Sequence, residues 1–263
     1  MKATQPIGIF DSGVGGLSIW KEIVTLLPKE NTIYLADSIN APYGKKSNAE
    51  IIKLSVKNTD LLLELGCKII VVACNTATTN AIDHLRNNYD VPFIGIEPAI
   101  KPAALKTLTN AIGILATKGT LSSKLFNTTS QKFAEGIRVI EQDGEGLVPL
   151  IEKGEVDSVE MHNLLKAYIN PMIKQHIDYL VLGCSHYPFL IPQIRKLVGE
   201  NVTIIDSGEA VARQTKAILE KFNLLNDENT RANHQLFTNG DINIMQHIID
   251  TFHIECSISY LDF

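Results

Sequence analysis

The chain has 263 residues, of which 45% are hydrophobic, and its 24 basic and 29 acidic side chains give a formal net charge of −5. This length suits one large domain or two ordinary ones, at about 100–200 residues each. The hydrophobic fraction is that of a folded globular protein and excludes a mainly disordered chain. A mildly acidic chain has no excess of positive charge for nucleic acid or an anionic membrane, so we expect neither as a partner.

Membrane spans, signal peptides and disulfide scaffolds are also not expected. No segment approaches the ~20 apolar residues of a membrane span. Residues 1–5 lead directly into an apolar stretch without a cleavable signal region. We therefore expect a cytoplasmic protein, in which the four cysteines are free thiols, metal ligands or catalytic groups.

In chain order, short runs rich in Val and Ile alternate with longer amphipathic stretches. The short runs are nearly continuous in apolar character, as in strands buried on both faces, and predict strands at Ile7–Phe10, Thr32–Ala36, Ile69–Ala73, Phe93–Ile96, Ala111–Ala116, Arg138–Glu141, Tyr179–Leu182 and Val202–Ile205. Capping residues near the starts of the longer stretches predict helices at Gly15–Leu27, Ser47–Leu65, Thr76–Asn87, Pro98–Thr107, Thr120–Phe133, Ser158–Gln175, Pro188–Val198 and Glu209–Lys221. This alternation predicts an α/β fold of mainly parallel sheets flanked by helices.

Two pairs of segments resemble each other along the chain. Residues 69–76 and 179–186 each place a cysteine and polar residues directly after an apolar strand. Residues 9–13 and 204–208 each place Asp-Ser-Gly in the same position. Turns between strands and helices favour small polar residues, which is enough to explain the second pair. This preference accounts less well for two cysteines at equivalent positions. We predict two similar α/β domains, residues 1–97 plus 210–263 and residues 98–209.

The candidate site residues follow predicted strands. Ligands of open parallel sheets bind beyond the carboxyl ends of the strands, where this sequence places Asp11, Ser12, Cys74, Asn75, Thr76, Cys184, Ser185 and His186. The start of the helix after Cys74 suits an anion and favours a thiolate. Cys74 and Cys184 are therefore candidate activated thiols. Most intracellular cysteines are inert buried hydrophobes, and this is the role we expect for Cys67 and Cys256.

Other motifs support weaker hypotheses. In an extended segment His186 lies on the same side as Cys184 and could hold the thiol proton, although a capping or core histidine fits equally well. Gly13, Gly15 and Gly16 match neither the dinucleotide fingerprint nor the P-loop, which indicates a tight turn.

Two further residues are candidates on local pattern alone. Tyr43, followed by Gly44, lies in a glycine turn and could donate a hydrogen bond to a ligand. Glu152 follows an apolar stretch within an acidic run and could turn inward.

Taken together, these residues resemble the glutamate racemase family. The matching segments occur in the family's order over almost the whole chain, at Gly8–Ser18, Tyr34–Asp37, Pro42–Gly44, Ala73–Ala77, Gly95–Pro98 and Leu182–Pro188. One departure is Ser185, where the family usually has Thr. A hydroxyl is kept, so we expect the substrate contact to survive.

The resemblance implies interconversion of L- and D-glutamate without a cofactor or metal, supplying D-glutamate for peptidoglycan synthesis. It implies an active site in the cleft between two domains, a homodimer, and Cys74 and Cys184 as the two acid/base residues. Assistance would come from Asp11 to Cys74 and from His186 and Glu152 to Cys184. Substrate contacts would come from Asp11, Ser12, Tyr43, Gly44, Asn75, Thr76, Ser185 and His186.

Four alternatives remain open from the residues themselves. A racemase of aspartate or another small acid would share the two thiols. A pyridoxal-phosphate racemase would need a Schiff-base lysine, and none stands out. A zinc site of Cys74, Cys184 and His186 would lack the usual close cysteine pair. A binding protein for a dicarboxylate would not need the thiols at all.

Overall fold

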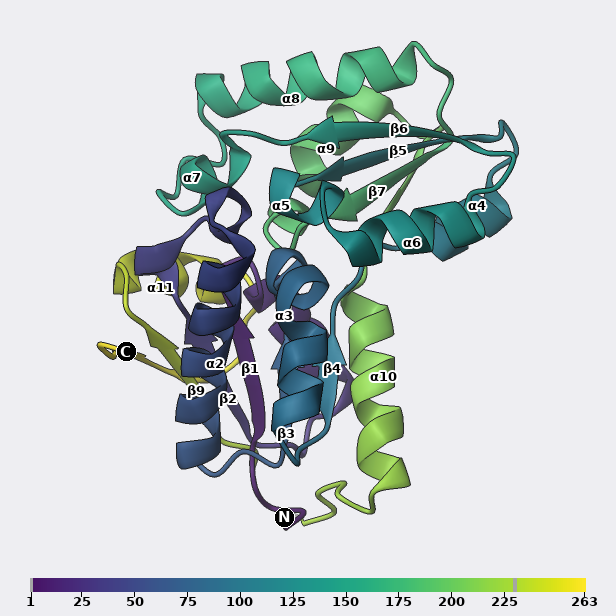
Figure 1. Cartoon of the computed structure of the whole chain (residues 1–263). Coiled ribbons are helices and arrows are strands. Elements are labelled where there is room, and N and C mark those ends of the chain that lie inside the picture. The colour runs from purple at the N-terminus through teal and green to yellow at the C-terminus, as the bar shows by residue number, and fades with distance from the viewer. Residues whose placement is uncertain (1, 229–230) are drawn as a thin grey trace.

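The computed structural model of the chain describes residues 2–228 and 231–263 and contains two parallel sheets, each covered by helices on both faces (Figure 1). The larger sheet has the strand order β10-β9-β2-β1-β3-β4. Its strands are β1 (Ile7–Asp11), β2 (Thr32–Ala36), β3 (Ile69–Val72), β4 (Phe93–Gly95), β9 (His234–Thr238) and β10 (Ser257–Tyr260). The smaller sheet has the order β6-β5-β7-β8, with β5 (Ala111–Ala116), β6 (Arg138–Asp143), β7 (Tyr179–Gly183) and β8 (Thr203–Ile205).

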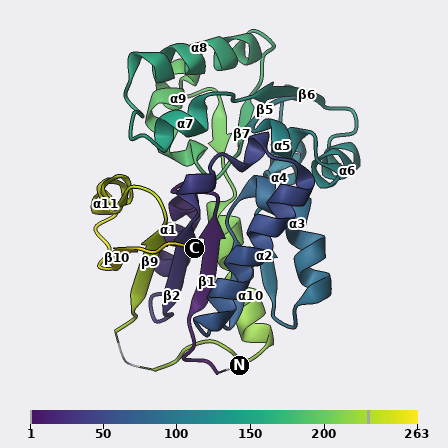
Figure 2. The same ribbon diagram turned by 60° about the vertical axis from the view of Figure 1, so that its left-hand side comes forward.

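Helices cover the larger sheet on both sides. One face packs against α1 (Leu17–Leu26) and α10 (Gly208–Lys221), and the other packs against α2 (Asn48–Glu64) and α3 (Asn75–Asn88). Because β1, β2 and β3 are buried along their whole length, they are almost entirely apolar. The exceptions are Asp11 at the end of β1 and Thr32 at the start of β2. The helix α11 (Ile242–Asp250) lies between β9 and β10, at the edge of this sheet (Figure 2).

The smaller sheet is built in the same way. The helices α4 (Ile100–Lys106) and α6 (Lys124–Phe133) pack against one face, and α8 (Val159–Ile173) and α9 (Ile191–Val198) pack against the other. Short elements fill the connections: α5 (Lys118–Leu121), α7 (Leu147–Ile151) and the 3₁₀ turns η1 (Ser38–Asn40), η2 (Tyr43–Lys45) and η3 (Tyr187–Leu190). The predicted α/β fold with two mainly parallel, helix-flanked sheets is confirmed.

Several predicted elements differ in detail. The helix predicted at Thr120–Phe133 is divided into α5 and α6, because the Ser123 side chain accepts a hydrogen bond from the Phe126 N–H and starts a new helix. The helix predicted at Pro188–Val198 begins as the 3₁₀ turn η3. The elements β9, β10, α7 and α11 were not predicted.

The chain crosses between the two sheets twice. After β4 it enters α4, which packs on β5 and β7, and after β8 it enters α10, which packs on α1 and β4. The hydroxyl of Ser207, just before α10, donates a hydrogen bond to the carbonyl of Glu97, just after β4. The two crossing segments are therefore held together.

A buried ion pair anchors the base of the larger sheet. The Nζ of Lys68 lies 2.6 Å from Oε2 of Glu30 and donates to the carbonyl of Leu224 at 2.8 Å, and both charged side chains are almost completely buried. The other carboxylate oxygen of Glu30 accepts the N–H of Asn226 at 2.8 Å. This pair therefore joins the start of β3 to the segment that follows α10. Among the described residues, no helix is long and apolar enough to cross a membrane.

Candidate active site

Asp11, at the end of β1, links the two halves of the candidate site. Its Oδ2 accepts the N–H groups of Gly13 at 3.2 Å and Gly16 at 3.0 Å, which fixes the turn before α1. Its Oδ1 accepts the hydroxyl of Ser185, after β7, at 3.1 Å. Burial raises the pKa of the Asp11 carboxyl, and the His186 charge opposes that rise only in part. The carboxyl ends of β1 and β7, from different sheets, therefore meet at this side chain.

Cys74 follows β3 and occupies the N-cap position of α3. Its sulfur accepts the Ala77 N–H at 3.4 Å, and its thiol lies 3.7 Å from the Ser12 hydroxyl oxygen. Burial, followed by the charge of Asp11, raises the pKa of this thiol well above its ordinary value. The hydrogen bonds of Ala77 and Ser12 only partly offset the rise. The helix terminus favours the thiolate as expected, but in the closed site burial and Asp11 outweigh it.

Cys184, after β7, lies beside an imidazole held by a carboxylate. Its sulfur is 3.8 Å from Nδ1 of His186, and Nε2 of that ring is 2.5 Å from Oε1 of Glu152. Burial lowers the pKa of His186. The hydrogen bonds with Cys184 and Glu152 and the nearby carboxylates outweigh this effect, so its pKa lies well above its usual value. These surroundings therefore favour the protonated form of the His186 ring.

Glu152 does turn inward and reaches across to the larger sheet. It is the C-cap residue of α7, and its Oε1 also accepts the N–H of Val14 at 2.7 Å. Its Oε2 accepts the hydroxyl of Ser38, in η1, at 2.8 Å. These contacts fix the carboxylate that holds His186. Sequence reasoning missed Ser38, because nothing near it in the chain indicates an interaction with a residue 114 positions away.

The glycines after β1 are required by close packing against this pair. A Cβ on Gly13 would lie 1.9 Å from Oε1 of Glu152, and one on Gly15 would lie 2.1 Å from Nδ1 of His186. Both distances are far below van der Waals contact. The sequence indicated a tight turn here, and the structure gives a second reason for glycine, namely the approach of two side chains from the other sheet.

Polar groups at the start of α3 face the same region. Asn75 is buried, and neither its amide nitrogen nor its amide oxygen has a hydrogen-bond partner among the described residues. The Thr76 hydroxyl lies 2.8 Å from that of Thr117 and 3.4 Å from that of Thr120, both on the other sheet's side. The two latter threonines were not predicted. The only sequence signal was their position directly after strand β5, because the other candidates also lie between the end of a strand and the start of a helix.

Tyr43 and Gly44, which were both predicted to contact the substrate, have different surroundings in the structure. The Tyr43 hydroxyl donates to Oδ2 of Asp37 at 2.6 Å and accepts from the Asn58 amide at 3.1 Å. Its proton is therefore used within the fold rather than offered to a ligand. Gly44 lies against Thr117, since a Cβ on it would be 3.0 Å from that side chain. Contact of Tyr43 with substrate stays a prediction.

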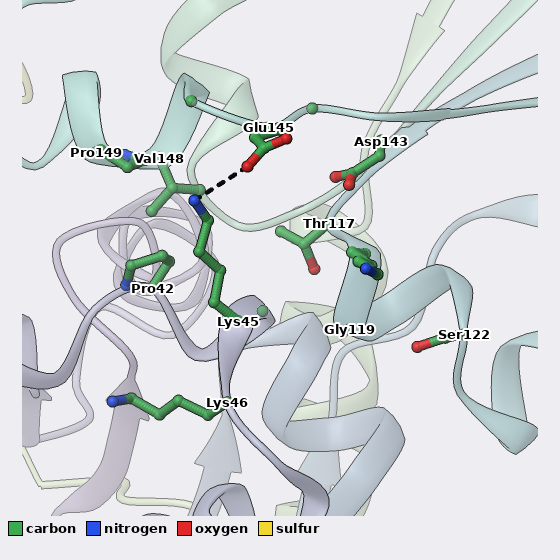
Figure 3. A pocket seen from close by; sticks show the side chains of 14 residues that line it. Pro42, Lys45, Lys46, Thr117, Gly119, Ser122, Asp143, Glu145, Val148 and Pro149 are labelled. Carbon is green, nitrogen blue, oxygen red and sulfur yellow. Dashed lines mark hydrogen bonds and ion pairs between the residues drawn. The ribbon is translucent and has the colours of Figure 1, made fainter.

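A hollow of about 440 Å³ lies outside this region, lined by segments from both sheets (Figure 3). Gly44 and Lys45 line it on one side, and Thr117, Gly119 and Glu145 line it on the other. The Nζ of Lys45 and Oε1 of Glu145 form an ion pair of 3.1 Å across it. We call this space the entrance hollow.

Both cysteines outside the site were expected to be inert buried hydrophobes, and this burial is found for Cys67 but only in part for Cys256. Cys67 is buried, burial raises its pKa to about 12, and Cys256 is half-buried. Within residues 2–228 and 231–263, no group of three or more His, Cys, Asp or Glu side chains is placed to hold a metal ion. The alternative of a zinc site at Cys74, Cys184 and His186 therefore gains no support.

The sequence and the structure are both similar to known racemases. The pattern of the Asp/Glu/Hydantoin racemase family matches residues 7–215. The glutamate racemase of Herpetosiphon aurantiacus is 46% identical, over 90% of this chain and 93% of that protein. That of Ectopseudomonas mendocina is 45% identical, over 94% of each.

Solved structures agree with this assignment. A glutamate racemase isoform from Bacillus anthracis superimposes with a TM-score of 0.86 at 33% identity, covering 98% of this chain and 97% of that one. The Escherichia coli glutamate racemase, solved with L-glutamate and the activator UDP-MurNAc-ala, has a TM-score of 0.86 at 32% identity, covering 98% of both chains. This chain is therefore an enzyme of the Asp/Glu/Hydantoin racemase family and belongs to its glutamate racemases.

Proposed function

We propose that the enzyme interconverts L- and D-glutamate without a cofactor, using Cys74 and Cys184 as the acid/base pair. The observation that carries this proposal is the position of the two buried thiols, which follow equivalent strands of two different sheets. Each has its own polar partners, and Asp11 lies between the two sites, because it is next to Ser12, which contacts Cys74, and accepts the hydroxyl of Ser185, next to Cys184. Relatives at about 45% identity are glutamate racemases.

Racemisation explains why two thiols are needed. The Cα proton leaves from one face of the substrate, and a proton returns to the other face. One thiolate and one thiol on opposite faces accomplish this without any group crossing the substrate plane. Acid/base assistance of this kind contributes roughly 10²–10⁴-fold to the rate, so the rest of the acceleration comes from binding and electrostatics.

The surroundings of the thiols suggest how their protons are managed. The imidazolium of His186, fixed by Glu152, supplies the positive charge that a thiolate at Cys184 needs. Cys74 is held as a thiol by burial and by the charge of Asp11. When the ammonium group of a substrate enters beside Asp11, its positive charge offsets that carboxylate and makes the Cys74 thiolate accessible in turn.

The start of α3 is the proposed binding place for a substrate carboxylate. The helix dipole and its free N–H groups favour an anion, and the Asn75 amide is buried there with no hydrogen-bond partner in the described part of the chain. A buried polar group without a hydrogen bond costs about 1–3 kcal/mol, and a bound carboxylate would recover that cost. The hydroxyl of Ser12 provides a further donor. The hydroxyls of Thr76, Thr117 and Thr120 bond one another beside it, and that of Ser185 donates to Asp11.

The remaining expectations are also part of the proposal. We place the enzyme in the cytoplasm as a homodimer that supplies D-glutamate for peptidoglycan, with domains at residues 1–97 plus 210–263 and 98–209. Light scattering of the purified enzyme tests the dimer. Depletion in a growing cell that is then fed D-glutamate tests the cell-wall role, because growth should return only with that supplement.

Deuterium exchange tests the reaction itself. The enzyme, L-glutamate and D₂O, with no other addition, should produce D-glutamate that carries deuterium at Cα. Cys74→Ala and Cys184→Ala should each abolish this turnover, whereas Cys67→Ala, at a buried thiol outside the site, should retain it. Turnover in both site variants would eliminate the two-thiol mechanism. Exchange into aspartate but not glutamate would assign a different substrate, and binding without exchange would indicate a binding protein.

A further inference from the structure

The entrance hollow carries an inference about how substrate reaches the thiols. Cys74, Asn75, Thr76 and Cys184 are each at most 6% exposed, so no molecule can reach them while the two sheets are in the observed arrangement. The halves must separate somewhere to admit a substrate. We expect the two halves to separate between segments that belong to different sheets. These segments should contact the site on their inner side and solvent on their outer side.

The entrance hollow meets this requirement. Its lining includes Gly44 on the larger sheet's side and Thr117 and Gly119 on the other side. Thr117 also touches Thr76, the residue after Asn75 at the start of α3. A Cβ on Gly119 would lie 2.9 Å from the Thr76 side chain and 3.1 Å from the backbone of Gly44. A single layer of residues therefore separates the hollow from the proposed carboxylate position.

The ion pair across the hollow is suited to open easily. Lys45 and Glu145 come from η2 and from the loop before α7, so their contact spans the two halves (Figure 3). Their side chains are 62% and 68% exposed, and pairs this exposed contribute little to stability. Parting the halves at this point would expose the Lys45 ammonium group to an incoming anion.

We propose that the entrance hollow is the route of the amino-acid dicarboxylate to the thiols, and that Lys45 receives its carboxylate in exchange for that of Glu145. This inference rests on the proposed function for the identity of the substrate. Lys45 is then a substrate-guiding residue rather than a catalytic one. The two partners of the ion pair should have opposite effects, because Lys45 attracts an anion and Glu145 competes with it.

Alkylation of the site thiols tests the route independently of racemase activity. Iodoacetate is an anion and transfers a carboxymethyl group to a thiolate, whereas iodoacetamide is neutral and transfers a carbamidomethyl group, each with loss of iodide. The ratio of their rates at Cys74 and Cys184, measured by mass spectrometry, cancels the frequency of opening and the reactivity of the sulfur. The charged groups around each sulfur are the same in every variant, so the change of this ratio from wild type reports the attraction of a negative charge along the route.

The expected results differ in sign. Lys45→Met should lower the iodoacetate to iodoacetamide ratio about fivefold, the effect of one unit charge at contact distance in water. Glu145→Gln should raise the ratio, and both effects should shrink at about 0.5 M salt. Lys166→Met, at an exposed position of α8, should leave the ratio unchanged, as should labelling of Cys256 in every variant.

Glutamate kinetics then connect the route to the reaction. Lys45→Met should lower kcat/KM by about fivefold and leave kcat nearly unchanged. Equal ratios in wild type, Lys45→Met and Glu145→Gln, or changes of the same sign in both variants, would overturn the proposal. If the ratios move as expected but wild type does not racemise glutamate, the proposed function fails and the anion route stands.

Discussion

Gly15→Ala is the substitution that most directly tests whether the turn after β1 positions the imidazole beside Cys184. The added methyl carbon would lie 2.1 Å from Nδ1 of His186 and 2.5 Å from two of its ring carbons. The ring must therefore move by about 1 Å or more to regain ordinary contact. It is 1% exposed and held by Glu152 at 2.5 Å, so it cannot move without loosening that bond.

The expected loss follows from this displacement. A misplacement of about 1 Å at a catalytic centre costs on the order of 10²-fold in rate, and overpacking of this kind costs about 1–3 kcal/mol of stability. We expect kcat to fall by about 10²-fold in both directions, with a folded protein and a modest decrease in melting temperature. Circular dichroism at a fixed wavelength follows either enantiomer of glutamate and gives kcat and KM for each direction.

Gly208→Ala is the matched control. The new methyl carbon would lie 3.0 Å from Cγ of Glu22, a flexible side chain that can move away. Its next two neighbours are Oδ1 of Asp206 at 3.1 Å and Cδ1 of Ile19 at 3.7 Å, and none of the three belongs to the candidate site. We expect its kcat to stay within about twofold of wild type, as for substitutions away from special features. If Gly15→Ala keeps more than half of the wild-type kcat, the reasoning that His186 must lie where it does is refuted.

Three further predictions concern binding and stability. Asn75→Ala should raise KM for glutamate about tenfold without lowering the melting temperature, because the amide has no hydrogen-bond partner among the described residues; a destabilised variant with normal KM would contradict this. Burial and Asp11 raise the pKa of the native Cys74 thiol above its ordinary value of 9.0, so the unfolded thiol ionises first as the pH rises. Wild-type stability should therefore fall more steeply above pH 9 than that of Cys74→Ala, by up to about 1.4 kcal/mol per pH unit; parallel pH curves in urea titrations would exclude this effect. Lys68→Met should lower the free energy of unfolding by about 3–5 kcal/mol, since it leaves Glu30 buried without its partner; an unchanged urea midpoint would show that Glu30 is solvated or neutral.

The parts of the fold that could be predicted are those with a local signal. Strands β1 and β3 are buried throughout, so both are apolar except for Asp11 at the end of β1. Strand β9 alternates between buried and partly buried residues, and β10 is mostly exposed at the edge of the sheet. Neither produces an apolar run, and their pairing with β2 and with each other is a tertiary contact that local pattern does not report.

The candidate site shows the same division. Residues next to strand ends, such as Asp11 and Cys74, could be predicted because each follows an apolar strand and precedes a turn or the start of a helix. Ser38 and Thr117 could not, because each acts on a residue of the other sheet and has no motif of its own. The pKa of Cys74 was also beyond local reasoning, since the helix terminus lowers it while burial and Asp11 raise it by more. The balance depends on how closely the two halves approach.

The pairing of β2 with β9 has a consequence for biosynthesis. Thr32 pairs with His234, so one edge of β2 stays unpaired until a strand about two hundred residues later has been translated. The strands of the smaller sheet lie within residues 111–205, so the last of them is synthesised 29 residues before β9 begins at residue 234. The smaller sheet, at residues 111–205, can thus fold first. Meanwhile the nascent N-terminal segment keeps an unpaired edge on β2, and such an edge can pair with strands of other chains.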